Sequence, residues 1–319
     1  MEDLEELLTP DASAFIKKLN TAVFPPKSKS HHWKGYDFIP GCSPKATEYA
    51  YKNWTFREGD VFLVSYPKTG TNWAKEIMRQ ILYRSETLDK LTNLLPINLR
   101  VLEIDPCEKF KVWDELPLKR RLIGTHLPPE LIDVERIKQA NAKVVYMLRN
   151  PKDQIVSWQK FLQNLDLSDE IMEMVDSGWE KYFEHVVTGE CPDGTKRGEW
   201  YPDHIRAWYK YKDYKNFYFL QYEEMKKDII GEIKKLAQFL EVSLCEEDIL
   251  KIANATSFSN MKASKTSDDN NHSHVLAVNM RKGEVGGWKN HFTVAQSEQI
   301  DAILEEKLNG VDIQFTYEL

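Results

Sequence analysis

The apolar positions of this 319-residue chain fall into short runs that alternate with longer segments of helical spacing. Four of these runs are short, contain β-branched or aromatic residues and are followed by residues that start helices. We therefore predict buried strands at 61–64, 121–123, 143–148 and 216–220. Because buried strands that alternate with helices usually align in parallel, the pattern predicts a largely parallel sheet.

Helices are predicted where apolar residues recur every three or four positions. After the third strand, Asn150 is a good N-cap and Pro151 suits the first helical position, while Ile155, Trp158 and Leu162 keep helical spacing. Further helices are expected at 229–240, 246–255 and 297–308, the last of them ending before Asn309-Gly310.

Two segments look irregular. Residues 27–53 are rich in proline, glycine and polar residues, and residues 264–288 include the run Thr266-Ser-Asp-Asp-Asn-Asn-His272. Long loops in compact domains are usually lids or binding loops, and the second segment contains Arg281-Lys-Gly283, so we expect a lid over an anionic ligand. No Pro/Gly/Ser linker divides the chain, and residues 1–319 are expected to form one domain.

Composition narrows the possible functions. A hydrophobic fraction of 42% and an aromatic fraction of 12% indicate an ordered globular protein. The net charge of −7 argues against broad nucleic-acid binding. No apolar run approaches membrane-spanning length, and the acidic start does not resemble a targeting signal. Four widely spaced cysteines suggest free thiols and no metal site. A cytoplasmic protein that contacts neither membrane nor nucleic acid is expected.

The first predicted strand leads through a compact turn into a segment of helical spacing at 74–82, in the sequence Ser65-Tyr-Pro-Lys-Thr-Gly-Thr-Asn-Trp73. Unpaired N–H groups at a helix start favour a phosphate or sulfate. Lys68 adds a full charge, Gly70 allows close approach, and Thr69 and Thr71 carry hydroxyl donors. The lysine precedes the only glycine, which disfavours the Walker motif of ATPases and GTPases.

This segment resembles the loop with which cytosolic sulfotransferases hold the 5′ end of 3′-phosphoadenosine 5′-phosphosulfate (PAPS). The resemblance extends, in the family's order, from about residue 61 to residue 298. It implies a single α/β domain with a central parallel sheet flanked by helices and a P-loop-like phosphosulfate-binding loop. By this resemblance, the donor contacts in the loop are Lys68, Thr69, Gly70, Thr71, Asn72 and Trp73.

Four later segments, at 147–157, 220–226, 256–262 and 280–289, resemble the remaining parts of the family's nucleotide site. Met147-Leu-Arg-Asn-Pro-Lys-Asp-Gln-Ile-Val-Ser157 places a guanidinium and a hydroxyl after the third strand, in the crevice where open α/β sheets bind ligands. The resemblance assigns the 3′-phosphate to Arg149, Ser157, Arg281, Lys282 and Gly283. It assigns adenine to Trp73, Tyr222, Thr256 and Phe258.

His126 follows the second predicted strand in Thr-His-Leu-Pro, which resembles the family's catalytic segment. A neutral imidazole accepts protons near neutral pH, so His126 is the candidate general base, and Lys68 is the candidate donor to the leaving group. Two positions depart from the family pattern. Gly124 stands where many members have lysine, and Gly287 stands where aspartate usually precedes the tryptophan.

The predicted activity is therefore transfer of a sulfuryl group from PAPS, without a metal, to a hydroxyl or amine of a small hydrophobic acceptor. Tyr36, Phe38 and Phe161 are candidate acceptor walls, between segments 27–53, 86–117 and the lid. A family dimer motif from Lys289 to Glu298 predicts a homodimer. Two alternatives remain: a non-catalytic protein that binds adenosine 3′,5′-bisphosphate (PAP), and a small-molecule kinase.

Overall fold

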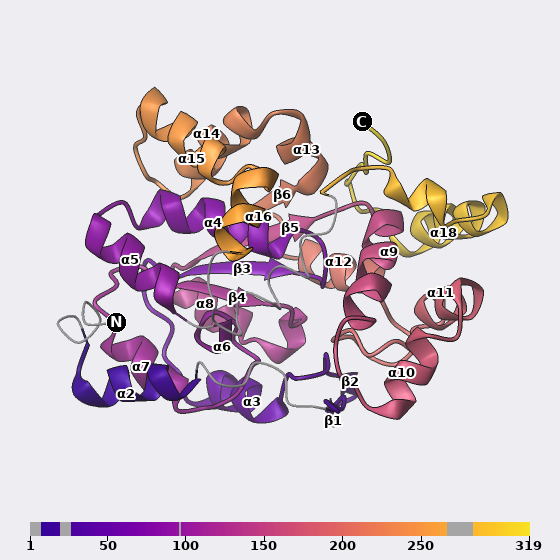
Figure 1. Cartoon of the computed structure of the whole chain (residues 1–319), viewed down its shortest axis with the longest axis horizontal. Helices are drawn as coiled ribbons and strands as arrows, with labels where there is room; N and C mark the ends of the chain where they lie inside the picture. The colour runs from indigo at the N-terminus through magenta and orange to yellow at the C-terminus, as the bar shows by residue number, and fades with distance from the viewer. Residues whose placement is uncertain (1–7, 20–26, 96, 267–282) are drawn as a thin grey trace.

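The computed structural model describes residues 8–19, 27–95, 97–266 and 283–319. Within them, a parallel sheet lies at the centre of the molecule, as the sequence predicts, with its strands in the spatial order β4-β3-β5-β6 (Figure 1). The strands are β3 (Val61–Ser65), β4 (Leu122–Thr125), β5 (Lys143–Leu148) and β6 (Phe217–Gln221).

The sheet is covered on both faces. All residues of β3, β4 and β5 are buried, whereas the edge strand β6 is mostly half-buried. Leu63 of β3 lies level with Gly124 of β4 and with Val145 of β5. Because parallel strands in register end together, the residues that follow β3, β4 and β5 meet at one edge of the sheet.

Helices surround this sheet, and α4 contacts β3 and β4 while α14 and α15 pack against α4 (Figure 1). The α-helices are α2 (Pro10–Leu19), α3 (Pro44–Lys52), α4 (Thr71–Leu82), α5 (Glu86–Leu94), α6 (Ile97–Arg100), α7 (Lys109–Glu115), α8 (Val134–Gln139), α9 (Pro151–Leu162), α10 (Asp169–Val175), α11 (Trp179–Val187), α12 (Tyr201–Tyr209), α13 (Tyr222–Lys227), α14 (Ile229–Phe239), α15 (Glu246–Ala255), α16 (Phe258–Thr266) and α18 (Val294–Lys307). Short 3₁₀ helices are η1 (Pro129–Leu131) and η2 (Gly287–Asn290), and β1 (His32–Trp33) pairs with β2 (Tyr36–Asp37).

Most predicted helices are confirmed, with small differences at their ends. The helix after Asn150 is α9, and the helix at 246–255 is α15. The predicted start of the last helix at 297 is wrong, because α18 begins at Val294. The Thr293 hydroxyl accepts a hydrogen bond from the Gln296 N–H at 3.2 Å and so caps the helix three residues earlier.

The prediction that 27–53 is irregular is wrong for its second half, where α3 forms. Ser43 is the N-cap, its hydroxyl accepts from the Lys45 N–H at 3.1 Å, and Pro44 takes the first helical position. The predicted lid at 264–288 is not irregular at its start, because α16 continues to Thr266. Residues 267–282 of this prediction lie outside the described residues, and its last residues lead into η2.

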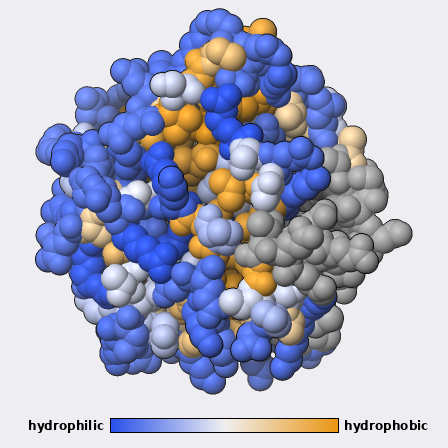
Figure 2. All heavy atoms as spheres, turned by 90° about the vertical axis from the view of Figure 1, so that its left-hand side faces the viewer, coloured by the Kyte–Doolittle hydropathy of each residue, from blue (hydrophilic) through white to orange (hydrophobic). Residues whose placement is uncertain are grey.

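The four cysteines, Cys42, Cys107, Cys191 and Cys245, are free thiols, as predicted. In the described ranges, no helix is long and apolar enough to cross a membrane. Figure 2 shows that the face on the left of Figure 1 is mainly hydrophilic, with apolar residues in a band through its centre.

Candidate active site

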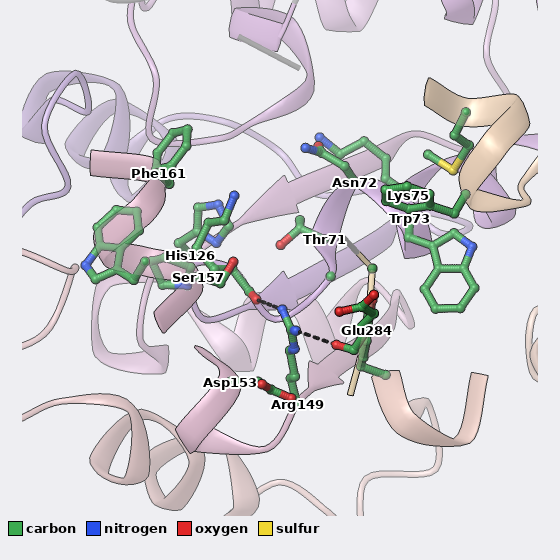
Figure 3. Close-up of a pocket in the computed structure, with 18 of the residues that line it drawn as sticks. Thr71, Asn72, Trp73, Lys75, His126, Arg149, Asp153, Ser157, Phe161 and Glu284 are labelled. Carbon is green, nitrogen blue, oxygen red and sulfur yellow. Dashed lines mark hydrogen bonds between the residues drawn. The ribbon is translucent and has the colours of Figure 1, made fainter. Parts of the chain in front are cut away.

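A cavity of about 240 Å³ lies at the edge of the sheet where β3, β4 and β5 end (Figure 3). Segments distant in sequence line it, including both segments expected to flank the acceptor and the last residues of the predicted lid. Its lining is formed by Ile39, Cys42, Pro67, Lys68, Gly70, Thr71, Asn72, Trp73, Lys75, Val101, Ile104, His126, Arg149, Asp153, Ser157, Trp158, Phe161, Tyr222, Lys226, Thr256, Phe258, Met261, Gly283, Glu284, Gly287 and His291.

The loop from β3 to α4 forms one wall of this cavity. Gly70 is the N-cap residue of α4 and has a φ of 112°, in the left-handed region that side chains disfavour. A Cβ on Gly70 would lie 2.7 Å from the Met147 Cε atom and 2.8 Å from the Tyr222 Cδ2 atom. Glycine is therefore required here by both conformation and space, and the N-terminal N–H groups of α4 begin at the cavity wall.

Lys68 also has a positive φ, of 68°, which is uncommon for a residue with a side chain. The Gln154 side-chain amide donates to the Pro67 carbonyl at 2.9 Å and helps to hold the loop in this form. The Lys68 Nζ atom lies 4.5 Å from the centre of the Phe161 ring, inside the cavity. The structure thus places the ammonium group of Lys68 where an anionic ligand would bind.

One prediction for the loop is wrong. The Thr69 hydroxyl does not face the cavity, because Thr69 is fully buried and its Oγ1 donates to the Tyr66 carbonyl at 2.9 Å. Thr71 and Asn72 do line the cavity. The Thr71 hydroxyl lies 2.7 Å from the Ser65 hydroxyl and so connects the loop to the end of β3.

His126 follows β4 and lines the same cavity. Its Nδ1 atom lies 2.7 Å from the Ser65 carbonyl oxygen, which can only accept, so Nδ1 carries the proton and Nε2 is left as the basic nitrogen. The backbone N–H of His126 donates to the buried carboxylate of Glu103 at 2.8 Å. These contacts fix the imidazole in one tautomer and one orientation.

Burial lowers the pKa of His126 below its ordinary value of 6.5. The Glu103 carboxylate and the hydrogen bond to Ser65 oppose this shift, while the ammonium groups of Lys75 and Lys68 reinforce it. The imidazole is therefore neutral at pH 7 and can accept a proton.

Arg149 follows β5, and its side chain connects the loop after β3 to the segment that contains Glu284 (Figure 3). Its guanidinium donates to the Lys68 carbonyl and to the Glu284 carbonyl, both at 3.2 Å, and lies 4.5 Å from the Tyr222 ring centre. Its buried Nε atom has no hydrogen-bond partner in the described part of the chain. Ser157, on α9, lines the cavity nearby. An anion would satisfy the remaining donor, since buried polar groups are normally paired.

The four predicted adenine contacts also line the cavity. The Trp73 and Tyr222 rings meet edge-to-face at 5.3 Å between centroids. The indole N–H of Trp73 is buried and has no partner among the described residues. The Thr256 hydroxyl donates to the Ile252 carbonyl at 2.7 Å, which leaves its oxygen free to accept. With Phe258, these side chains form a partly aromatic compartment.

The last residues of the predicted lid are held by Asp153 of α9. This carboxylate accepts from the Gly286 N–H at 2.8 Å and from the Trp288 N–H at 2.9 Å. A Cβ on Gly287 would lie 3.6 Å from an oxygen of Asp153, so an aspartate there would bring a second carboxylate close. Gly283 lines the cavity, whereas the predicted contacts Arg281 and Lys282 lie outside the described residues.

Of the three residues predicted to contact the acceptor, one lines the cavity and two do not. Phe161 lines the cavity, but Tyr36 and Phe38 are not among its lining residues. Tyr36 is buried under the Lys196 ammonium, 5.1 Å from its ring, and Phe38 packs on Trp33. Ile39 and Cys42 reach the cavity instead. The aromatic residues of 27–53 suggested an apolar wall, but the sequence did not show which side chains of this segment face inward.

Sequence reasoning also missed two cavity lysines, Lys75 and Lys226. Lys75 lies four residues after Thr71 and therefore on the same face of α4, a spacing that could have identified it. Lys226 of α13 has its Nζ atom 6.0 Å from the Trp73 ring centre. In the described ranges, no group of three or more His, Cys, Asp or Glu side chains could hold a metal ion.

A parallel α/β sheet with a glycine-containing loop at a helix start, a neutral histidine and an arginine at its carboxyl edge is an arrangement suited to an anionic ligand such as phosphate or sulfate. A family model described as "Sulfotransferase domain" matches residues 58–312. The amine sulfotransferase of Oryctolagus cuniculus is 34% identical, over 84% of this chain and 86% of its own length. Human sulfotransferase 2A1 is 35% identical, over 80% of this chain and 86% of its own.

Among solved structures, the mouse sulfotransferase SULT7A1 complexed with PAP matches with a TM-score of 0.71 and 30% identity. The match covers 89% of this chain and 96% of the mouse one. The chain belongs to the sulfotransferase family. The family, the α/β fold and the enzyme class expected from the sequence are thereby confirmed.

Proposed function

We propose that this enzyme transfers the sulfuryl group of PAPS to a hydroxyl or amine of a small, largely hydrophobic acceptor. The observation that carries this proposal is that Lys68, His126 and Arg149, from three different strand ends, converge on one cavity. An anion-binding loop beside a neutral, oriented imidazole suits a reaction between an anionic donor and a protonated nucleophile.

The residues present fit the donor. The N-terminus of α4, with Lys68, Gly70, Thr71 and Asn72, would hold the 5′ phosphosulfate through backbone N–H groups and the ammonium. The buried Nε of Arg149, which has no partner among the described residues, would donate to the 3′-phosphate beside Ser157. Arg281 and Lys282 are proposed contacts of the same phosphate. The mouse relative was solved with PAP, which is the product this donor would leave.

The adenine would lie in the compartment formed by Trp73, Tyr222, Thr256 and Phe258. Aromatic rings stack on bases with a contribution of about 1–3 kcal/mol per contact in single-stranded nucleic-acid binders. The Thr256 oxygen is available to accept a hydrogen bond from the amino group of the base. These roles agree with the positions of all four side chains on the cavity wall.

His126 would act as the general base. As the acceptor oxygen or nitrogen forms its bond to sulfur, the proton of that atom passes to Nε2 of His126. The bond from sulfur to the bridging oxygen breaks, and its electron pair stays on the phosphate oxygen of PAP. Lys68 would stabilise that oxygen. General-base catalysis contributes about 10²–10⁴ in rate, and a preorganised donor about 10²–10³.

The acceptor would occupy the apolar end of the cavity, beside Phe161, Trp158, Ile39, Val101 and Ile104. Such a lining favours a hydrophobic acceptor over a strongly polar one. One relative is named an amine sulfotransferase, whereas the name sulfotransferase 2A1 states no acceptor. We therefore propose both hydroxyl and amine acceptors.

The two alternatives have little support. A non-catalytic PAP-binding protein would not need an imidazole held in one tautomer by the Ser65 carbonyl. The only feature that favours a non-catalytic protein is Gly124, where many family members have lysine. A small-molecule kinase would need the Walker spacing, which the loop at 65–73 lacks.

The cellular setting and the assembly state also belong to this proposal. We expect a cytoplasmic homodimer whose contact runs from Lys289 to Glu298, and one domain over residues 1–319. Val294, inside the contact segment, is 76% exposed, which suits a small apolar contact between two copies. Light scattering of the protein and of Val294→Glu would test the dimer.

The function is tested by incubating the purified protein with PAPS and a panel of phenols, steroids, aliphatic alcohols and amines. Mass spectrometry should detect a sulfated acceptor together with PAP. His126→Ala is the matched control for transfer that does not depend on the site. The proposal fails if no acceptor is sulfated above that control, or if ATP serves as donor in place of PAPS.

A further inference from the structure

Lys75 is a cavity residue without an assigned role. It belongs to the second turn of α4, one helical turn after Thr71, and it lines the cavity together with Lys68 and His126 (Figure 3). It is only 8% exposed. A charged lysine this deeply buried is uncommon unless a negative partner or ligand compensates for its lost hydration.

The ammonium of Lys75 lies against Gly124, the position where many family members carry lysine. A Cβ built on Gly124 would lie 3.4 Å from both the Cε and the Nζ atoms of Lys75. Lys75 therefore occupies the space into which a side chain at position 124 would begin to extend. Positions 75 and 124 belong to different elements, α4 and β4, but side chains at the two positions would occupy the same space.

The backbone explains why position 124 itself carries no side chain. A Cβ on Gly124 would lie 2.9 Å from the Arg100 carbonyl oxygen, which is closer than real Cβ contacts. Segment 100–102 packs directly along β4, since Val101 forms a β-bridge with Gly124 and the Leu102 N–H donates to the Gly124 carbonyl at 2.9 Å. A lysine at 124 would require this backbone to move, whereas Lys75 reaches the site without any such change.

The charge of Lys75 affects the pKa of His126, the candidate base. It is one of the groups that lower the pKa of His126, together with burial and Lys68, and against the Glu103 carboxylate and the Ser65 hydrogen bond. Lys75 and His126 also line the same cavity, so a ligand bound there can lie between them.

We propose that the Lys75 ammonium binds the sulfuryl oxygens during transfer and takes the part of the lysine that is absent at position 124. This inference rests on the proposed function. It assigns the charge on the transferred group to Lys75 and the charge on the leaving oxygen to Lys68. The reaction itself is unchanged: the acceptor proton still goes to His126, and the leaving electron pair still goes to the phosphate oxygen.

The test compares Lys75→Gln and Lys75→Arg with the unaltered enzyme. Lys75→Gln should lower kcat at saturating PAPS by about 10–100-fold, somewhat less than the loss of a whole oxyanion donor because Lys68 remains. PAP affinity should change less than about threefold. The pKa of His126 should rise when the charge is removed, so the acid limb of kcat/KM should move to higher pH. Lys75→Arg, which keeps the charge, should recover most of kcat and restore the pH profile.

Lys90→Gln is the matched control, because it removes the same charge from an exposed ion pair with Glu86 on α5. Thermal unfolding of each variant shows whether it folds, and Lys75→Met replaces Lys75→Gln if the latter does not. A kcat within twofold of the unaltered enzyme, or a loss confined to PAP affinity, overturns the inference while leaving the proposed function standing. Absence of transfer by the unaltered enzyme overturns both.

Discussion

At the scale of single residues, the proposed reaction depends on the tautomer and the pKa that the surrounding groups give to His126. The Ser65 carbonyl holds the proton on Nδ1, and burial favours the neutral ring. His126→Ala should therefore reduce kcat by about 10²–10⁴. PAP binding should survive, because the phosphate contacts lie on other residues. Steady-state kinetics and calorimetry of the same variant check both parts, and unchanged turnover would remove His126 from the mechanism.

The pH dependence of activity follows from the same residue. Burial lowers the pKa of His126 below 6.5, so the imidazole stays neutral, and therefore basic, at a lower pH than an exposed histidine does. Activity should persist as pH falls and be lost only when the ring becomes protonated. The acid limb of kcat/KM should accordingly lie below pH 6.5. A limb above that value would show that another group is titrating or that the imidazole is not desolvated in solution.

Lys68 is expected to act on the leaving group more than on binding. Its ammonium already lies in the cavity, 4.5 Å from the Phe161 ring centre, and the neighbouring helix N-terminus and Arg149 also attract the phosphates. Lys68→Ala should lower kcat by about 10²–10³ and weaken PAP binding by a smaller factor. Comparison of single-turnover rates with PAP affinities checks this. An equal loss in both would indicate a role in binding only.

At the scale of elements, the loop between β3 and α4 requires glycine at position 70. Gly70→Ala would combine a left-handed backbone with contacts at 2.7 and 2.8 Å. The free energy of unfolding should fall by about 2–5 kcal/mol, since a left-handed residue costs about 1–2 kcal/mol and overpacking about 1–3 kcal/mol. PAP affinity should fall as well, because the loop must shift.

Gly35→Ala provides the control for this element. Gly35 has a φ of 86° but nothing within 4 Å of a Cβ, so only the backbone cost of about 1–2 kcal/mol should appear. Denaturant unfolding of both variants measures the difference. Equal losses would show that the loop can accommodate a side chain at position 70.

The elements themselves were largely predictable. Buried parallel strands such as β5 read as continuous apolar runs, and α15 begins and ends where its pattern does. Segment 27–53 was misjudged because its proline and glycine content obscured α3, although Ser43-Pro44 is a helix start in its own right. In that segment the two residues at the helix start predict the structure, whereas the overall composition does not.

The roles of side chains were less predictable than the elements. Thr69 and Thr71 look equivalent in sequence, but the Thr69 hydroxyl turns back to Tyr66 whereas Thr71 faces the cavity. Lys75 gains its place only because α4 packs over β4 beside Gly124. Such contacts arise from tertiary packing, which neither periodicity nor a motif records.

At the scale of the whole molecule, the sheet brings together residues that follow β3, β4 and β5, and of these Lys68 and Arg149 are 81 positions apart in sequence. The Arg149 guanidinium links the Lys68 and Glu284 carbonyls, and Asp153 holds the Gly286 and Trp288 N–H groups beside them. His126 is joined to the loop through the Ser65 carbonyl. The loop at 65–73, the candidate base and residues 284–288 therefore form one connected site.

The central claim is that this site recognises an adenosine with two phosphates, one at the N-terminus of α4 and the other beside Arg149. Calorimetric titration with PAP and with AMP tests it most directly. Because each charge-assisted hydrogen bond contributes about 1.5–3 kcal/mol, the 3′-phosphate should tighten binding at least about tenfold. Equal affinities for PAP and AMP would contradict the account.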